Sequence, residues 1–151
     1  MTGEDNILKL LDAEPAPAYQ LDGQVGFVLR KAHQRHVSIF AARIGDLTPP
    51  QFAALARLAE IGEASQNQLG AMVAMDAATI KGVIDRLKAR GLVTLSKHEG
   101  DKRRLMVGLT AEGRAAVESL IPLAEEITAE TLAPLSAKEA ETFIKLLAKI
   151  A

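Results

Sequence analysis

The sequence predicts a mainly α-helical fold that carries one small β-hairpin. Apolar residues recur every three or four positions along most of the chain, which is the period of a helix facing a core. Ser or Thr stands three residues before Gln or Glu at Thr48, Ser65 and Ser136, the pattern of a helix-starting capping box. Near residue 105, apolar residues alternate with other types, as in a half-buried strand.

The composition is typical of a soluble globular protein, with 48% hydrophobic and 25% charged residues in 151. Aromatic residues make up only 3%, so aliphatic side chains must form the core. The absence of cysteine excludes disulfides, thiolate metal sites and thiol redox sensing. No apolar run approaches the roughly 20 residues of a membrane span, and the first ten residues do not resemble a signal peptide. We therefore expect a cytoplasmic protein with no membrane partner and no cofactor.

The charge is unevenly distributed, although the net formal charge is only −1. Between Asp76 and Arg104 there are eight Lys or Arg against four Asp or Glu, and the rest of the chain has ten against fifteen. A basic segment in an otherwise acidic chain can bind nucleic acid locally while the remainder resists non-specific association. The charge pattern therefore favours a polyanion as partner of this segment.

The elements are expected in the following order. A short amphipathic start with apolar residues at 7, 8, 10 and 11 and a proline-containing break precede a long helix over about 23–43. A helix capped by Thr48, with Pro49 at its first position, ends at Gly62. Two more helices start at the caps Thr110, with a kink expected at Pro122, and Ser136. The last helix carries an apolar stripe of Phe143, Leu146, Leu147 and Ile150.

The middle of the chain predicts a helix-turn-helix followed by a hairpin. A short helix capped by Ser65 is joined by residues 74–76 to a second helix, which Asp76 caps at its start and Gly91 at its end. Two β-forming runs, "LVTLS" and "RRLMVGL", then enclose the charged loop "KHEGDK". A helix-turn-helix with a hairpin directly behind it is a winged helix.

The second helix of this pair has an unusually small outer face. Its inner stripe contains Ile80, Val83, Ile84 and Leu87. Its outer face contains Ala78, Gly82, Asp85 and Ala89, with Lys81 and Arg86 on the flanks. A glycine within a helix costs about 1 kcal/mol relative to alanine, and a low face of this kind suits entry into the DNA major groove. The alternative is a tolerated glycine on a solvated face, with Asp85 paired to Lys81 and Lys88.

These segments together resemble the MarR family of bacterial transcription regulators. The resemblance rests on "LTPPQFAALARL", the helix-turn-helix ending in G-L-V, and "GDKRRLMVGLTAEG" with its D-x-R-R motif, and it covers nearly the whole chain. It implies a homodimer whose two winged helices read a palindromic operator in double-stranded DNA, and a ligand cavity beside the dimerisation helices. On this basis residues 1–47 and 111–151 would dimerise and 48–110 would bind DNA.

The DNA-binding residues follow from the recognition helix and the wing. Asp101 and Arg103 match the D-x-R positions, where a carboxylate would hold an arginine extended for the minor groove. Arg104 is the neighbouring candidate, while Lys97, His98 and Lys102 would contact phosphates without reading sequence. The predicted set is Ala78, Thr79, Lys81, Gly82, Arg86, Asp101, Lys102, Arg103 and Arg104.

The long first helix is the expected sensor. Its predicted buried stripe comprises Val25, Val28, Leu29, Ala32, Ile39 and Phe40, and two polar residues, His36 and Arg43, interrupt it. Either these are structural, with His36 at a dimer interface and Arg43 paired with Asp46, or they bind a small anionic or aromatic effector such as an aromatic acid or its acyl thioester. The predicted ligand residues are Phe27, Arg30, His33, His36, Phe40, Arg43 and Phe52. The segments "QFAAL" and "MDAATIKG" also resemble those of regulators of aromatic-acid breakdown.

A metal sensor, a winged-helix module without DNA binding and an enzyme are the alternatives to the predicted ligand-responsive repressor. A metal sensor would use His33 and His36. Because the chain has no cysteine and His98 lies far away in the wing, only these two histidines could converge on a metal ion. A winged-helix module that has lost DNA binding conflicts with the basic segment and the wing motif. An enzyme lacks support because no nucleophilic triad, paired carboxylates or phosphate loop occurs at a suggestive spacing.

Overall fold

The computed structural model describes residues 18–101 and 103–151. The predicted amphipathic start at 7–11 and Lys102 lie outside the described residues. The chain divides into two units, residues 1–33 and 34–151. In the first unit, a turn of 3-10 helix, η1 (Leu21–Gly23), leads into helix α2 (Val25–Arg43), which continues into the second unit.

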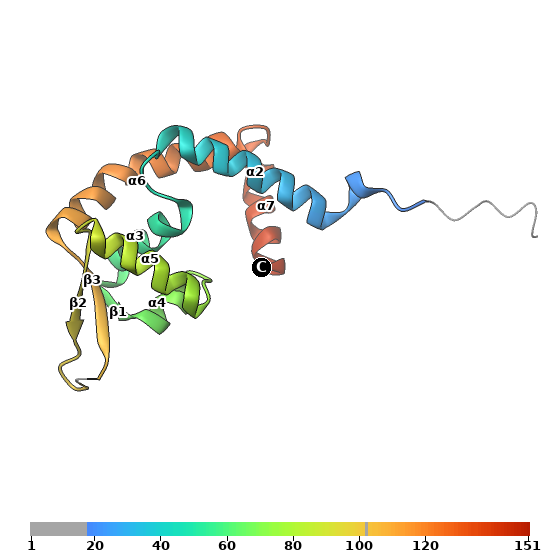
Figure 1. The fold of residues 1–151 in the computed structure, drawn as a ribbon. Coiled ribbons are helices and arrows are strands. Elements are labelled where there is room, and N and C mark those ends of the chain that lie inside the picture. The colour runs from blue at the N-terminus through green and yellow to red at the C-terminus, as the bar shows by residue number, and fades with distance from the viewer. Residues whose placement is uncertain (1–17, 102) are drawn as a thin grey trace, which may run out of the picture. The chain divides into compact units, whose positions relative to one another are not determined.

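In the described residues of the second unit, five further helices and three strands follow α2 (Figure 1). They follow in the order α3 (Pro49–Ile61), β1 (Glu63–Ser65), α4 (Gln66–Met72), α5 (Ala77–Ala89), β2 (Val93–Lys97), β3 (Leu105–Leu109), α6 (Ala111–Leu132) and α7 (Ala137–Ile150). The predicted order of helices, hairpin and helices is therefore confirmed.

Side-chain caps fix the helix starts where the sequence predicted them. Thr48, Ser65 and Ser136 each accept a hydrogen bond from the backbone N–H three residues on. The side-chain oxygen of the Gln or Glu at that position accepts in turn from the cap's own N–H. These reciprocal bonds satisfy donors that the first helical turn leaves free. Gly91, just beyond α5, has a φ of +74°, a left-handed conformation that glycine adopts without strain.

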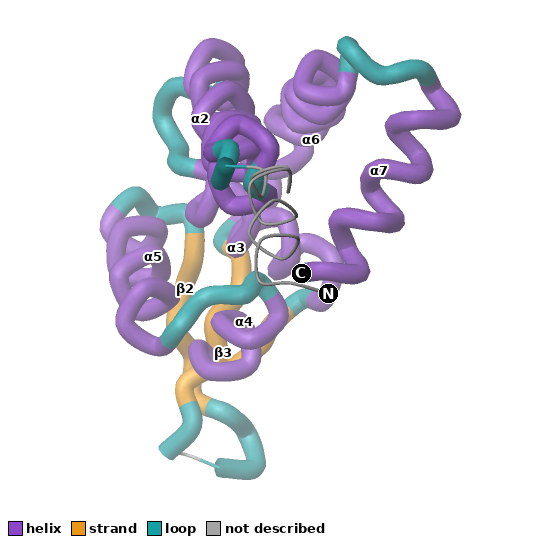
Figure 2. The backbone as a smooth tube through the Cα atoms, turned by 90° about the vertical axis from the view of Figure 1, so that its right-hand side faces the viewer, coloured by secondary structure: helices purple, strands orange, loops and turns teal. Residues whose placement is uncertain are grey.

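The hairpin of β2 and β3, drawn in orange in Figure 2, belongs to a small antiparallel sheet with strand order β1-β3-β2. In the hairpin, Val93 pairs with Leu109 and Lys97 with Leu105. Strand β1 was not predicted; it pairs Glu63 with Gly108 and Ser65 with Met106. Three residues are too few to show a period of two, so its strand character comes from the partner β3 rather than from its own pattern.

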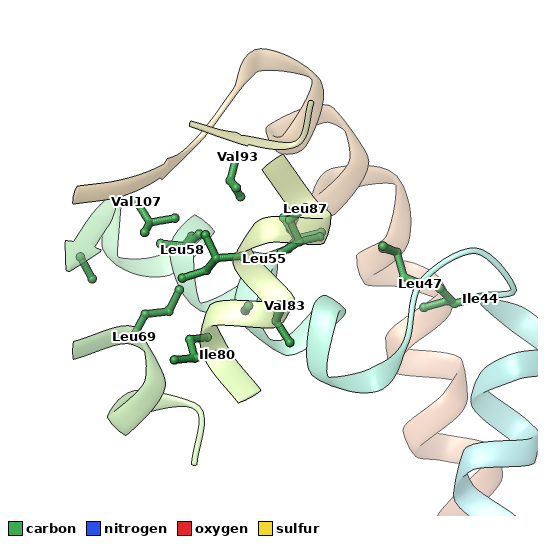
Figure 3. Packing of buried hydrophobic residues seen from close by; sticks show 14 of the residues in the cluster. Ile44, Leu47, Leu55, Leu58, Leu69, Ile80, Val83, Leu87, Val93 and Val107 are labelled. Atoms are coloured by element: carbon green, nitrogen blue, oxygen red, sulfur yellow. The ribbon is translucent and has the colours of Figure 1, made fainter. Parts of the chain in front are cut away.

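The core of the second unit lies where α3, α4 and α5 meet the sheet and the start of α6. Figure 3 shows Leu55 of α3 beside Leu87 of α5, with Leu58 on the side of Val107. The fully buried larger side chains are Ile44, Leu55, Leu58, Leu69, Ile80, Ile84, Leu87, Val107 and Val117. These aliphatic contacts hold α5 against the domain by its inner face only, which leaves its outer face free.

Two predicted apolar stripes are not buried within the chain. On α2 only Ile39 and Phe40 are buried, whereas Val25, Val28 and Leu29 are exposed. On α7 no residue is buried, and Phe143, Leu146 and Ile150 are 40%, 55% and 67% exposed. Within one copy of the chain, the residues that the structure describes therefore leave these faces uncovered. Helix α6 runs continuously past Pro122 as one element.

Candidate nucleic-acid interface

Helix α5 presents the predicted small outer face to solvent. Its inner residues Ile80, Val83, Ile84 and Leu87 are buried, while Ala78, Thr79, Lys81, Arg86 and Ala89 are exposed. The four-residue inner stripe anchors the helix, so the whole opposite side remains available to a partner.

The glycine on this outer face is not required by the packing of the chain. A Cβ atom built at Gly82 would meet nothing closer than the Arg86 Nη1 atom at 3.9 Å. The domain itself would therefore accept a larger residue. Because Gly82 has no side chain, an external surface can approach the helix closely at this position.

The cations beside Gly82 differ in their engagement. Lys81 Nζ lies 2.9 Å from Asp85 Oδ2, an exposed ion pair one helical turn apart. This contact matches part of the alternative in which the outer face is merely solvated. A base or phosphate that binds Lys81 must compete with Asp85 for it. This competition costs little free energy, because exposed ion pairs of this type are weak.

The start of α5 is closed by a carboxylate. Asp76 Oδ1 accepts a hydrogen bond of 2.7 Å from the Thr79 backbone N–H. This bond, together with one from the Thr79 side chain, holds the pKa of Asp76 below its ordinary value. The predicted cap is confirmed, and the negative charge at this helix end competes with a phosphate for the same N–H groups.

The end of α5 is tied to the loop that follows α2. The Arg90 guanidinium donates through Nη2 to Asp46 Oδ2 at 3.0 Å and through Nη1 to the Asp46 backbone carbonyl. The expected pairing of Arg43 with Asp46 is wrong, because Asp46 pairs with Arg90 while Arg43 pairs with Glu126 and Glu130. Asp46 lies in the loop between α2 and α3, two residues after the buried Ile44.

The wing is a charged hairpin tip between β2 and β3. Lys97, Asp101, Arg103 and Arg104 are all exposed. Asp101 Oδ1 accepts a hydrogen bond of 3.0 Å from the Arg103 backbone N–H. The expected contact of Asp101 with the arginine side chain is thus replaced by a contact with its backbone, which shapes the turn and leaves the guanidinium unheld by this carboxylate. Lys102 lies outside the described residues.

Polar residues of α2 bind the C-terminal half of α6. Arg43 forms ion pairs with Glu126 at 2.6 Å and Glu130 at 2.9 Å. His36 Nδ1 lies 2.9 Å from the Thr131 hydroxyl oxygen, and Arg35 donates to the carbonyls of Glu130 and Thr131. Both interrupting residues of the predicted stripe thus have partners within the chain, so His36 does not depend on a dimer interface for its hydrogen bond.

The other predicted ligand residues divide between the two units. In the second unit, the rings of Phe40 and Phe52 meet edge to face with centroids 6.2 Å apart. In the first unit, the Arg30 guanidinium lies 5.7 Å from the centroid of the Phe27 ring, and His33 is exposed. The ligand role of these seven residues remains a prediction.

Sequence reasoning missed the partners that lie far along the chain. Glu126 and Glu130 follow Arg43 by 83 and 87 residues, and Arg90 follows Asp46 by 44. The available signal was the spacing of Glu126 and Glu130. Two carboxylates one helical turn apart can both pair with one arginine. Among the described residues, no group of three or more His, Asp or Glu side chains is arranged to hold a metal ion.

These features define a winged helix-turn-helix protein. Helices α3, α4 and α5 share one core, α5 exposes its outer face, and a charged hairpin follows it. The model of the MarR family matches residues 47–105. The HTH-type transcriptional repressor NicR of Pseudomonas putida is 42% identical over 134 residues, which are 87% of this chain and 85% of NicR. The chain therefore belongs to the MarR family of transcription regulators.

Solved structures agree with this assignment. A probable transcriptional regulator from Pseudomonas aeruginosa is 53% identical with a TM-score of 0.86, covering 87% of this chain and all of its own. BpsR of Bordetella bronchiseptica, whose DNA binding is regulated by 6-hydroxynicotinic acid, is 42% identical with a TM-score of 0.85 over 89% of this chain and 97% of its own. No helix in the described part of the chain is long and apolar enough to span a membrane.

Proposed function

We propose that the protein is a homodimeric repressor that binds a palindromic operator through α5 and the wing and is released by a small aromatic acid. One observation carries the proposal: Gly82 opens the outer face of a well-anchored helix although the chain's own packing does not need a glycine there. A helix keeps such a residue against its propensity when another surface must approach closely.

The roles of the residues follow from their positions. Ala78 and Gly82 lower the outer face for the major groove, and Thr79 and Lys81 face the base edges. Arg86 contacts the backbone, while Arg103 and Arg104 reach the flanking minor groove or phosphates. Lys102 and Lys97 add contacts that do not depend on sequence, and Asp101 shapes the wing turn.

The dimer is inferred from the uncovered apolar face of α7. Phe143 and Leu146 also line an open hollow of about 470 Å³ at the start of α7. A second copy of the chain would cover this apolar face, because symmetric homodimers bury the same surface patch on both subunits. Two α5 helices one turn of DNA apart, roughly 34 Å, would then read two half-sites.

The effector class follows from BpsR, which responds to 6-hydroxynicotinic acid. The aromatic pair Phe40 and Phe52 offers an apolar wall, and His36 and Arg43 offer polar groups nearby on α2. Because Arg43 already pairs with two carboxylates, an anionic ligand would have to compete with Glu126 and Glu130 for it. This competition gives the effector a means to change the contact between α2 and α6.

The test is selection of genomic DNA fragments by the purified protein at two salt concentrations. We expect a palindrome whose affinity falls steeply with salt, since bound cations are released from phosphates. Gly82→Glu should abolish specific binding through bulk and charge without unfolding the protein, and Arg103→Ala should weaken binding or relax the preference for A·T-rich flanks. Diffuse binding alone would favour a module that no longer reads DNA, and a Gly82→Glu variant that still binds the palindrome would show that this face of α5 does not enter the groove.

The effector is tested on the recovered fragment. We expect 6-hydroxynicotinic acid to release the protein from the fragment, and benzoic acid, which lacks the ring nitrogen and hydroxyl, to do so less well. If His36→Ala with Arg43→Ala binds DNA normally but no longer responds, these residues sense the ligand. No release by either acid would contradict the effector class while leaving the DNA-binding role intact.

A further inference from the structure

The tip of the wing is organised around the imidazole of His98. Its Nδ1 atom accepts hydrogen bonds from the backbone N–H groups of Gly100 and Asp101, both at 3.0 Å. The His98 backbone N–H donates to the Arg104 carbonyl at 2.9 Å, which closes the hairpin. The side chain is partly buried, and its ring lies against Gly100, where an added Cβ atom would stand 3.2 Å from the ring carbon Cε1.

Both partners of Nδ1 are donors, so this nitrogen must carry a lone pair. The neutral ring with its proton on Nε2 meets that need, whereas the imidazolium has a proton on both nitrogens and cannot accept. His98 therefore acts here as a hydrogen-bond acceptor and not as a cation. The same arrangement, acceptance from N–H groups two and three residues on, is one that Asn and Ser side chains form in turns.

The turn held by His98 extends to the wing arginines. Asp101, whose N–H binds the imidazole, uses its carboxylate to accept from the Arg103 N–H at 3.0 Å. The Asp101 carbonyl accepts from the Arg104 N–H, also at 3.0 Å. A continuous set of hydrogen bonds thus runs from the imidazole through Asp101 to the backbone of both arginines.

We propose that His98 is a positioning residue for DNA binding, which acts by holding the wing turn and not by contacting phosphate. The inference rests on the proposed role of the wing arginines in operator binding. A turn already formed in the free protein spares the complex the entropic cost of ordering it. Loss of the acceptor would leave two backbone N–H groups without their partner and Arg103 on a loosened loop.

Three substitutions separate an acceptor from a cation. In His98→Asn the amide oxygen takes the place of Nδ1, and we expect operator affinity within about twofold of the unsubstituted protein. In His98→Gln the amide lies one methylene further out, and in His98→Lys the charge is kept without any acceptor. For both we expect affinity to fall about tenfold, since two hydrogen bonds of ordinary strength are lost.

The measurements are affinity for the fragment recovered by the unsubstituted protein, its salt dependence, and ¹⁵N NMR of the histidine rings in the full-length protein. We expect the His98 ring to show its proton on Nε2, and the salt slope to stay unchanged in His98→Asn. A phosphate contact gives the opposite pattern: His98→Lys binds normally, while Asn and Gln both reduce affinity and salt slope. That pattern, or equal affinity in all three variants, overturns the proposal.

Controls keep this inference apart from the proposed function. Arg103→Ala reports on the wing directly; if it weakens binding while the His98 variants do not, the wing functions without His98. If the unsubstituted protein recovers no specific fragment, the proposed function fails. The NMR result then decides the remaining point, because a proton on Nδ1 is incompatible with the described turn.

Discussion

Two glycines in helices illustrate how differently one residue type can be required. A Cβ atom at Gly113, in the first turn of α6, would lie 1.9 Å from the Leu92 carbonyl oxygen. That carbonyl also accepts from the Thr110 N–H, so the start of α6 is pressed against the chain between α5 and β2. Gly113 is thus a packing requirement, in contrast to Gly82, whose surroundings are open.

Alanine substitutions at these two positions should have opposite effects on stability. We expect Gly113→Ala to lower the free energy of unfolding by about 3 kcal/mol, because backbone must move to admit a methyl group. Gly82→Ala should raise it by about 0.5–1 kcal/mol through helix propensity alone. Urea unfolding monitored by circular dichroism measures both. A destabilised Gly82→Ala variant would contradict the claim that the protein's own packing leaves that site open.

Asp76 predicts a pH dependence of stability. Hydrogen bonds from Thr79 lower the pKa of this carboxyl in the folded state. A lowered pKa adds stability that is present above the ordinary aspartate value of about 3.9 and is lost as the pH falls through the folded-state pKa. Asp76→Asn keeps a capping oxygen without a titrating proton. Its free energy of unfolding should therefore fall less between about pH 5 and about pH 3 than that of the unsubstituted protein. Equal losses in both proteins would show that the cap does not depend on the charge.

At the scale of elements, the contact between α2 and α6 is polar and partly exposed. Arg43 pairs with both Glu126 and Glu130, and its side chain is 35% exposed. On α3, Arg57 forms a comparable but single pair with Glu60 and is 43% exposed. The Arg57 pair joins residues of one helix, whereas the Arg43 pairs join two helices, so only the latter affect how the helices are held together.

We expect Arg43→Gln to lower the free energy of unfolding by at most about 1 kcal/mol, because exposed ion pairs are screened by water. Arg57→Gln serves as the matched control and should cost less. Both losses should shrink in 1 M salt, where the screening length falls to about 3 Å. Thermal and urea unfolding at low and high salt provide the comparison; a loss at Arg43 that is independent of salt would indicate packing rather than charge.

Most elements could be predicted because they depend on residues close together in the sequence. The contacts between elements could not, because they depend on residues far apart in the sequence. Capping boxes at Thr48, Ser65 and Ser136 depend on residues three apart, so the sequence contains the whole interaction. The partner of Arg43 depends on which faces of α2 and α6 pack, and choosing the nearest carboxylate selected Asp46 wrongly. Strand β1 was missed for the same reason, since its hydrogen bonds come from β3, more than forty residues further along.

The candidate site divides in the same way. The small face of α5 could be predicted because a helical period and one glycine define it. The acceptor role of His98 could not be predicted, because a histidine in a basic loop is equally well read as a phosphate contact. Only the backbone geometry of Gly100 and Asp101 distinguishes the two roles.

At the scale of the whole molecule, α7 has no buried side chain although its apolar residues form a continuous stripe. Such a helix is poorly stabilised in a single chain, because most helical stability in proteins comes from burying an apolar face. A second copy that covers Phe143, Leu146 and Ile150 would supply that burial. Dimerisation and the order of α7 are therefore expected to be coupled.

Leu146→Glu should separate the dimer, because a carboxylate buried in an apolar interface without a partner is strongly unfavourable. Lys145→Glu is the matched control, since Lys145 is exposed on α7 and pairs with Glu141 on the same helix. Sedimentation velocity should show monomers for Leu146→Glu at concentrations where Lys145→Glu remains dimeric. Because each monomer then binds one half-site alone, affinity for the full palindrome should fall by about a hundredfold or more, while a single half-site is bound as before. A Leu146→Glu variant that stays dimeric and binds the palindrome normally would show that the apolar face of α7 is not the interface between copies.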